Sequence, residues 1–281
     1  MPSRAAAPLR LVKGKLQVIK TNTFCRALTI TGGALESKRS ILMKIIKNLS
    51  QSSVGHKLVL AATGALLFLF VLAHLAGNLQ FFLGPATINA YGHVFQDNEN
   101  LRWPLRIALL MTVGLHAWTA LKLTFENRKA RPLGYAGNPP PVAASYASRT
   151  MLMTGLIVAA FVGYHLLHFT VRAEAVNLTG QNFSILMEKA PDGHERHNIF
   201  AMMVLGFRQP LVSAFYLVGV GLLSFHLSNG LRAVFQSLGL KNGKWDPIVN
   251  RVAPVIAWLV FLGYGSIPIA VLLGFGKEAL K

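Results

Sequence analysis

The stretch LVSAFYLVGVGLLSFHLSNGLR, residues Leu211–Arg232, is apolar along most of its length and holds one histidine near its end. An α-helix of roughly 20 such residues crosses a hydrocarbon core about 30 Å thick. The strands of a membrane β-barrel are about half that length and alternate in polarity, which this stretch does not. The sequence therefore predicts an all-α, polytopic membrane protein with five transmembrane helices in a bundle. The expected spans are Leu58–Leu79, Leu105–Leu123, Met151–Val171, Leu211–Leu231 and Val252–Phe275.

Composition and charge favour a membrane protein over one that binds nucleic acid. Of the 281 residues 53% are hydrophobic and 14% are charged, and the net charge is +18. With the N-terminus inside, the inner segments hold 20 Lys and Arg against 3 acids, and the outer segments hold 8 against 7. An excess of this kind marks the cytoplasmic side, so the basicity reflects topology and attraction to anionic lipid. We expect a multi-pass protein of the bacterial cytoplasmic (inner) membrane, with a cytoplasmic N-terminus and no nucleic-acid partner.

The chain divides into a basic extension, residues 1–48, and a transmembrane domain, residues 49–281. The extension has no long apolar run, and we expect it to be mobile. A transit peptide, or a reading frame whose true start is Met43, are alternatives for this segment. The proline-rich GNPPPV segment, Gly137–Val142, is expected to link the second and third spans. The lone Cys25 excludes an internal disulfide, a cysteine-ligated iron–sulfur cluster and a covalent C-x-x-C-H haem attachment.

Histidines are the informative residues inside the spans, because an ionisable side chain there is costly and usually faces the bundle interior. At about 1.5 Å of helical rise per residue, depth can be counted from the basic residue that flanks each span on the inner side. His74 lies 17 residues after Lys57 and His165 lies 16 after Arg149, whereas His116 and His226 each lie 6 residues before a basic residue. The counts predict two pairs, His74 with His165 and His116 with His226, at levels roughly 16 Å apart.

Four histidines on four successive spans, paired by depth, are the ligands that two six-coordinate haem irons require. Imidazole ligates ferrous and ferric iron, and ligation on both sides favours electron transfer over oxygen binding. A tetrahedral zinc site would gather its ligands at one level, and a proton relay would normally add Asp or Glu within the spans. The alternative for each histidine alone is a single interhelical hydrogen bond. We therefore predict a bundle that encloses two haems.

Two neighbours of His226 fit this interpretation. Gly230 lies one turn further along the same helical face, where its missing side chain leaves room for a flat macrocycle. Arg232 lies at the inner boundary, where it can pair with a propionate. Close helix packing is the alternative role for the glycine, and an interfacial anchor is the alternative for the arginine.

Short motifs surround the four histidines: LAHLAGN around His74, GLHAW around His116, FVGYHLLHF around His165 and FHLSNGLR around His226. The loop INAYGHVF, Ile88–Phe95, follows the first of them, and the resemblance that these stretches carry covers about residues 50–275. In this part the chain resembles the cytochrome b membrane-anchor subunit of succinate dehydrogenases and fumarate reductases, in its five-helix, dihaem, single-chain form. The most specific element is the His-x-x-x-Gly-x-Arg pattern that ends the fourth span.

The resemblance implies roles for the whole chain. The four histidines would be axial ligands of two non-covalent b haems, with His74 and His165 on the distal haem and His116 and His226 on the proximal one. The chain would be a subunit of the enzyme that binds no succinate itself. It would anchor a flavoprotein and an iron–sulfur subunit and exchange electrons with menaquinone or ubiquinone in the lipid. The number of copies in the assembled complex is left open.

A quinone site is implied less directly. The stretch SSVGHK is similar to the S-x-x-H-R motif that opens the first helix of related quinone-reactive anchors. By this resemblance Ser53 and Lys57 would line a quinone site, with His56 near a propionate. The alternative is a helix-capping serine and interfacial basic residues. Glu174 is a candidate for an outer quinone carboxylate by position alone.

The other histidines are assigned simpler roles. We expect His168 to form a hydrogen bond at the outer rim, because depth favours His165 as the ligand. His93, His194 and His197 fall in outer connections and are expected to be solvated, although His93 could approach the distal haem. Two further functions stay open: a dihaem cytochrome b of another respiratory enzyme, such as a hydrogenase or formate dehydrogenase, and a haem-free anchor or transporter.

Overall fold

The structure is a computed structural model. It describes residues 9–12, 15–18, 40–41, 43–44, 52–130, 150–190 and 193–280, in two units, Met1–Gly55 and His56–Lys281.

In the first unit, strands β1 (Leu9–Val12) and β2 (Lys15–Val18) form an antiparallel hairpin, with Leu9 opposite Val18. This hairpin was not predicted. The rest of the predicted extension, apart from residues 40–41 and 43–44, and the predicted linker Gly137–Val142 lie outside the described residues.

The described part of the chain contains five helical segments that are long and apolar enough to cross a membrane. The predicted all-α, multi-pass membrane architecture is therefore confirmed at this level. The segments are α2 (Ser53–Leu79) with η1 (Gln80–Leu83), α4 (Glu99–Lys129), α6 (Met151–His165) with η2 (Leu166–Val171), α9 (Pro210–Ser237) and α10 (Trp245–Leu272).

The observed helices contain four of the five predicted spans entirely, and several run further at both ends. The fifth prediction, Val252–Phe275, is wrong at its end, because α10 stops at Leu272. The chain turns there through Gly274 and Gly276, whose φ angles of 106° and 80° lie in the left-handed region that glycine tolerates. Hydrophobicity alone does not predict this turn, since Leu273 and Phe275 are as apolar as the helix before them.

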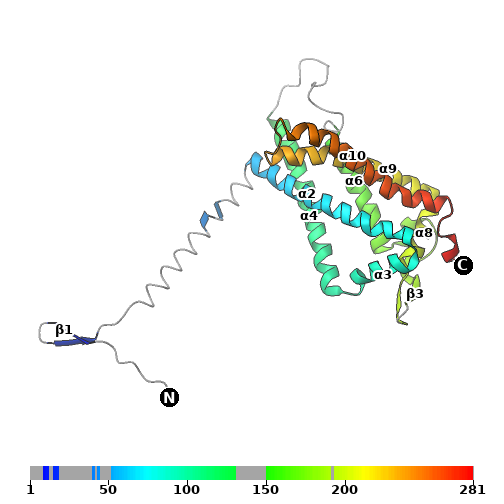
Figure 1. Cartoon of the computed structure of the whole chain (residues 1–281), viewed down its shortest axis with the longest axis horizontal. Helices are drawn as coiled ribbons and strands as arrows, with labels where there is room; N and C mark the ends of the chain where they lie inside the picture. Colours follow the sequence, from blue (N-terminus) through cyan, green and yellow to red (C-terminus); the bar gives the residue numbers. More distant parts are fainter. Residues whose placement is uncertain are drawn as a thin grey trace, which may run out of the picture. The chain divides into compact units, whose positions relative to one another are not determined.

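Short elements cover one end of the bundle, which we call the capped end (Figure 1). They begin where their sequences favour it: Pro85 opens α3, and the Asn198 side chain accepts a hydrogen bond from the Ala201 amide at the start of α8. The strands β3 and β4 pair antiparallel, with Met187 opposite His197. The capped end consists of α3 (Pro85–Gln96), α7 (Glu174–Asn177), η3 (Phe183–Ile185), β3 (Met187–Lys189), β4 (Glu195–His197) and α8 (Ile199–Phe207).

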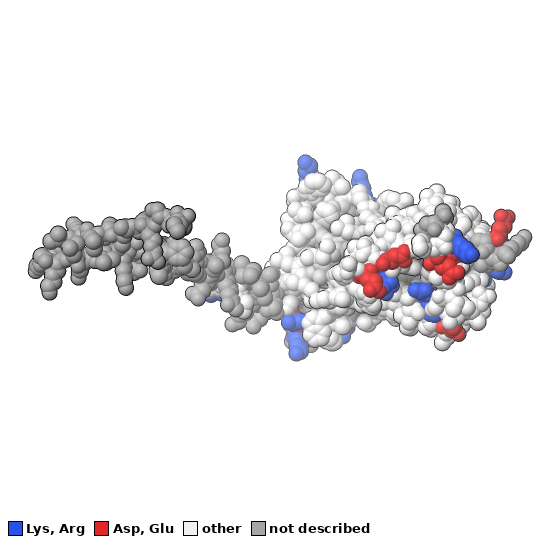
Figure 2. All heavy atoms as spheres, turned by 90° about the horizontal axis from the view of Figure 1, so that it is seen from below, with Lys and Arg blue, Asp and Glu red and all other residues white. Residues whose placement is uncertain are grey.

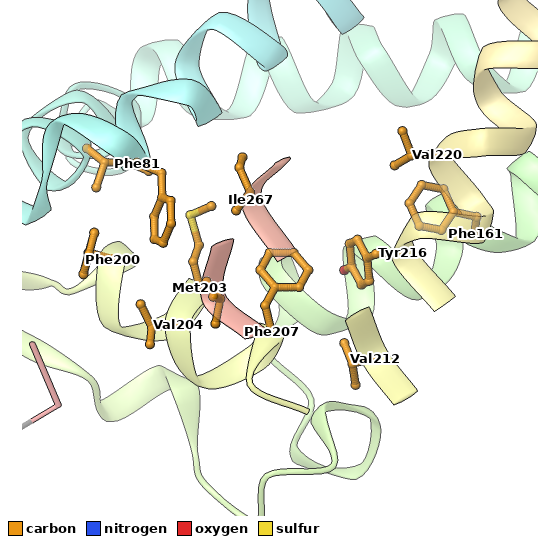
Figure 3. Close-up of a cluster of buried hydrophobic side chains, with 12 residues drawn as sticks. Phe81, Phe161, Phe200, Met203, Val204, Phe207, Val212, Tyr216, Val220 and Ile267 are labelled. Atoms are coloured by element: carbon orange, nitrogen blue, oxygen red, sulfur yellow. The ribbon is translucent and has the colours of Figure 1, made fainter. Parts of the chain in front are cut away.

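The main hydrophobic core lies next to the capped end. Helix α8 supplies its centre, and α9 and α10 add the side chains around it (Figure 3). Seven of the nine residues of α8 are buried, which explains a run that is apolar all round yet too short to cross a membrane. The core residues are Phe81, Ile88, Phe161, Phe200, Met203, Val204, Phe207, Val212, Tyr216, Val220, Ile267 and Val271.

The long helices differ in how much of their surface they bury. In the most apolar window of α2 and of α4 only 11% of the residues are buried, against 33% in α9 and in α10. Helix α10 still holds α2 through specific contacts: the Tyr264 hydroxyl donates to the Val71 carbonyl at 2.8 Å, and Leu75 lies against Gly263. Most of the residues in these parts of α2 and α4 are therefore not covered by other residues of the described chain.

Charge is distributed unevenly along the membrane domain. In Figure 2 the visible Asp and Glu side chains all lie toward the capped end, whereas only Lys and Arg are visible at the opposite end. We call that opposite end, which carries Lys57, Lys122 and Arg232, the basic end. The pattern has the asymmetry that membrane proteins show between their two faces.

A buried polar network fastens α3 to the elements around it. Asn89 is fully buried. Its amide nitrogen donates to Glu188 at 2.6 Å and to Asn198 at 3.1 Å, and its amide oxygen accepts from the Phe200 amide at 2.9 Å. Arg196 in turn donates from Nε to Glu188 at 2.6 Å. A single side chain therefore bonds three residues of the capped end, one on β3 and two at the start of α8.

We predict that Asn89→Ala destabilises the protein by about 1–3 kcal/mol, because it removes the hydrogen-bond partner of Glu188 Oε2 and of the buried Phe200 amide. Thermal unfolding in detergent, followed by circular dichroism, measures this change. Asn100→Ala, at an exposed position in the first turn of α4, is the control and should leave the transition unchanged. Equal transitions for the two variants would contradict the role of the network.

Candidate functional site

Two histidines from α2 and α6 face each other inside the bundle. His74 lies in the last turns of α2, and His165 is the final residue of α6. Their ring centroids are 5.8 Å apart, with the ring planes at 73°. Aromatic side chains surround this pair: Phe70 stacks on His74 at 5.3 Å, Phe161 lies 6.3 Å from His165, and Tyr264 lies 6.0 Å from His74.

The second pair of histidines comes from α4 and α9. His116 of α4 and His226 of α9 have ring centroids 6.3 Å apart, again with the planes at 73°. These are the pairs that the depth counts predict. The structure brings no ring of one pair into aromatic contact with a ring of the other within the described residues.

A polar side chain contacts the Nδ1 atom of each of the four rings. Thr63 Oγ1 lies 3.1 Å from Nδ1 of His116, and Thr154 Oγ1 lies 3.4 Å from Nδ1 of His226. The Tyr216 hydroxyl lies 3.4 Å from Nδ1 of His165. Within the described residues, the Nε2 atoms of these three histidines have no hydrogen-bond partner, so each ring has one nitrogen held and one available.

His74 is contacted differently. The amide nitrogen of Asn78, one turn further along α2, lies 3.1 Å from Nδ1 and 3.4 Å from Nε2 of the ring. The same nitrogen donates to the His74 carbonyl at 2.7 Å. The amide therefore touches both nitrogens at the ring edge and is the one group that must turn if Nε2 is to bind a metal.

The spacing of the rings can be tested against a metal held between them. A metal–imidazole bond is about 2 Å long and the ring centroid lies about 1 Å behind the nitrogen, so two axial imidazoles on one iron have centroids about 6 Å apart. The observed 5.8 Å and 6.3 Å match this value. Two neutral nitrogen donors on opposite sides are also the donor set that haem iron accepts. The spacing of the paired rings therefore fits one iron held between the two imidazoles of each pair.

The neighbours of His226 lie where the sequence places them. A Cβ added at Gly230 would meet no atom within 4 Å, so the space beside this glycine is open. One Nη atom of Arg232 lies 3.4 Å from the Asn250 carbonyl, and its buried Nε has no partner among the described residues. The guanidinium thus retains a donor at the basic end of the bundle.

The residues proposed for a quinone site lie at the start of α2. His56 is buried, and its Nδ1 lies 3.4 Å from a carboxylate oxygen of Glu126 on α4. Ser53 and Lys57 are both exposed. The hydroxyl that accepts from a backbone amide in this first turn belongs to Ser52, at 3.0 Å from the Gly55 nitrogen. The expected capping role therefore falls to Ser52 rather than to Ser53.

The other candidates separate into exposed and buried groups. Glu174 and His194 are exposed, and His93 in α3 pairs with Asp97, the residue that follows this helix. His168 is fully buried, not at a rim, and its Nδ1 lies 3.0 Å from the Tyr216 hydroxyl. The predicted hydrogen bond of His168 is therefore present, and it is formed by a buried side chain of the π-helical segment η2 that follows His165.

Sequence reasoning missed Thr63, Thr154, Tyr216 and Asn78. All four are polar residues within predicted spans, and such residues normally face a partner inside the bundle. Only Asn78 stands one helical turn from the histidine that it contacts. The other three belong to different helices from their partners, so no spacing within a single span reveals them.

Comparisons with protein-family models, with curated proteins and with solved structures find no match to this chain.

His197 corrects another expectation. It was predicted to be a solvated loop residue, but it is buried in β4, and its Nδ1 donates to the Leu186 carbonyl at 2.7 Å. The chain before α8 forms the hairpin of β3 and β4. Strands of three residues are too short to show the alternation of apolar and polar residues by which a strand is recognised in a sequence. Burial lowers the pKa of His197 below 6.5, an effect to which the charge of Arg172 adds and which the hydrogen bond to Leu186 opposes.

We predict that His197 contributes to acid sensitivity of the capped end. Because its folded pKa lies below its unfolded value, the stability contribution of the neutral ring is present above about pH 6.5 and is lost as the pH falls below that value. His197→Asn keeps a donor for the Leu186 carbonyl and removes the titration, so its melting temperature should fall less between pH 7 and pH 5. His194→Asn, at an exposed position, is the control. An unchanged pH dependence in His197→Asn would contradict the assignment.

Proposed function

We propose that this chain is the membrane-anchor cytochrome b subunit of a succinate:quinone oxidoreductase, of the succinate dehydrogenase and fumarate reductase type. In this role it holds two b haems and passes electrons between an iron–sulfur subunit and membrane quinone. The chain itself carries out no succinate chemistry. The flavoprotein and iron–sulfur partners are proposed from the resemblance of the histidine motifs, above all the His-x-x-x-Gly-x-Arg pattern of His226, Gly230 and Arg232.

The observation that carries the proposal is the pairing of four intramembrane histidines at the spacing of axial ligands. Ring centroids 5.8 Å and 6.3 Å apart leave room for one iron between the rings of each pair, as two metal–imidazole bonds of about 2 Å require. Three of the four histidines do form an interhelical hydrogen bond, which was the alternative role, but each of these bonds uses Nδ1 alone. Those bonds do not require the rings to lie in two pairs, and a direct hydrogen bond between paired rings would bring their nitrogens within about 3 Å. The two pairs support a dihaem protein over both alternatives.

A haem held by two imidazoles exchanges one electron reversibly and has no open position for oxygen. The chain supplies the binding and orientation. His116 and His226 offer Nε2 from opposite helices, while Thr63 and Thr154 hold the Nδ1 atoms. At the other pair, Tyr216 holds His165.

The surroundings of the two pairs differ. The pair His74 and His165 lies beside the main hydrophobic core, since Phe161 and Tyr216 belong to that core and contact His165. This packing excludes water from one side of the pair. The pair His116 and His226 is contacted by Thr63 and Thr154 and has Gly64 and Gly155 beside its rings. It also lies closer along the helices to Lys122 and Arg232. The two haem sites should therefore differ in polarity and in reduction potential.

The basic end is the proposed face for the soluble partners. It carries the positive charge that marks a cytoplasmic side, which supports a cytoplasmic N-terminus in a bacterial inner membrane. Ser53 and Lys57 are exposed at this end of α2 and are proposed to contact quinone. The contact of His56 Nδ1 with the Glu126 carboxylate, at 3.4 Å, links the start of α2 to the end of α4 there, and His56 is proposed to lie near a propionate.

We predict that the four histidines fall into two groups when each is changed to alanine. His74→Ala and His165→Ala should each lose the distal haem, and His116→Ala and His226→Ala should each lose the proximal one, because a single remaining imidazole holds haem weakly. The measurement is a redox titration of each purified complex, followed in the α band, which resolves the two haems by their midpoint potentials.

His194→Ala is the matched control, since this histidine is exposed and lies outside the spans; both haems should remain. Loss of different haems by the two members of one pair would contradict the assignment.

A further inference from the structure

Helices α2 and α6 carry the same residues at the same spacing around their histidines. The pattern Thr-Gly-x5-Phe-Val-x2-His-Leu occupies Thr63–Leu75 in α2, and again Thr154–Leu166, from the first turn of α6 to the first residue of η2. The residues between these positions differ, so the repeat is confined to particular places on the helix. Six identical residues at the same spacing indicate that the two segments have the same structural role.

The repeated residues make equivalent contacts in the structure. Thr63 touches Nδ1 of His116 on the following long helix, and Thr154 touches Nδ1 of His226 on the following long helix of its own half. The glycine after each threonine lies against the same ring: an added Cβ would come within 3.2 Å of Cε1 of His116 at Gly64, and within 3.3 Å of Cε1 of His226 at Gly155. Each Thr-Gly pair therefore forms the contact surface for one imidazole ring.

The two helices that carry these rings, α4 and α9, also have similar sequences after the histidine. His116 is followed by Ala120, Leu121 and Lys122, and His226 by Gly230, Leu231 and Arg232, with the same spacing of a small, an apolar and a basic residue. The four helices thus form two equivalent pairs, α2 with α4 and α6 with α9. The histidine pairs join one half to the other, which is the arrangement of parallel repeats related by an approximate twofold axis along the membrane normal.

The hydrogen bonds of the two threonines fix how their histidines are protonated. A threonine hydroxyl has one proton, and Thr63 donates it to the Val59 carbonyl at 2.8 Å, one turn back in its own helix. Thr63 Oγ1 can then only accept from His116, whose Nδ1 must carry the ring proton. Thr154 donates to the Thr150 carbonyl at 3.0 Å and accepts from His226 in the same way. Both rings are left with an unprotonated Nε2, which is the atom a metal binds.

We propose that Thr63 and Thr154 are matched positioning residues of the haem held by His116 and His226, each fixing the tautomer and orientation of one axial imidazole. The inference rests on the proposed function. It adds that both threonines act on one haem, although they belong to the helices whose own histidines, His74 and His165, serve the other.

The test uses Thr63→Val and Thr154→Val, which keep the shape of the side chain and remove the acceptor, in the full complex. A hydrogen bond to Nδ1–H makes the imidazole a stronger donor to ferric iron, so its loss should shift the midpoint potential of the haem upward. Both variants should shift the same haem and weaken its binding by about tenfold or more, with the other haem unchanged. Thr63→Ser and Thr154→Ser, which keep the acceptor, should restore the potential.

Thr112→Val is the control, because Thr112 donates only to the Ala108 carbonyl on α4, one turn before His116. If the valine variants do not assemble, Gly64→Ala and Gly155→Ala provide a second test, since the added Cβ presses on the same two rings and should disturb the same haem. Equal shifts of both haems, shifts of different haems by the two threonine variants, or no shift would overturn the proposal. A wild-type complex without haem would instead overturn the proposed function on which it rests.

Discussion

An imidazole inside a membrane must find partners for two ring nitrogens where no water is available, and this requirement organises the bundle. Each of the four intramembrane rings has a polar side chain at Nδ1, supplied in three cases by another helix. The rings lie together in two pairs, with centroids 5.8 Å and 6.3 Å apart. In the proposed function, a metal between the paired rings would bind the nitrogens that these side chains do not contact.

The distribution of hydrophobic packing follows from this arrangement. Helices α9 and α10 pack closely with α8 and form the main core at the capped end, while α2 and α4 bury little of their own surface against the rest of the chain. A stable core at one end can hold four helices in register even where they do not pack tightly on each other. The polar network of Asn89, Glu188 and Arg196 fixes how the elements beside that core are oriented, because each of these side chains has a hydrogen-bond partner.

The sequence predicts the membrane helices well and their surroundings less well, for identifiable reasons. Helical rise is uniform and each span has a basic flank, so depth counting pairs His74 with His165 and His116 with His226, as the structure does. The contacts of Thr63 and Tyr216 depend on which helices are neighbours and on how each helix is rotated about its axis. The depth of a residue along its span gives neither. The burial of His168 depends on the π-helical turn after His165, and that of His197 on a hairpin of three-residue strands. The apolar run of α8 was passed over because it is too short for a span, although it forms the centre of the core.

The central claim is that each chain holds two haems between paired histidines, and haem stoichiometry in the purified complex tests it most directly. The account predicts two b-type haems per chain by the pyridine haemochrome assay, together with a b-type α band in the dithionite-reduced spectrum. A complex that contains no haem, or a single haem per chain with all four histidines intact, would contradict it.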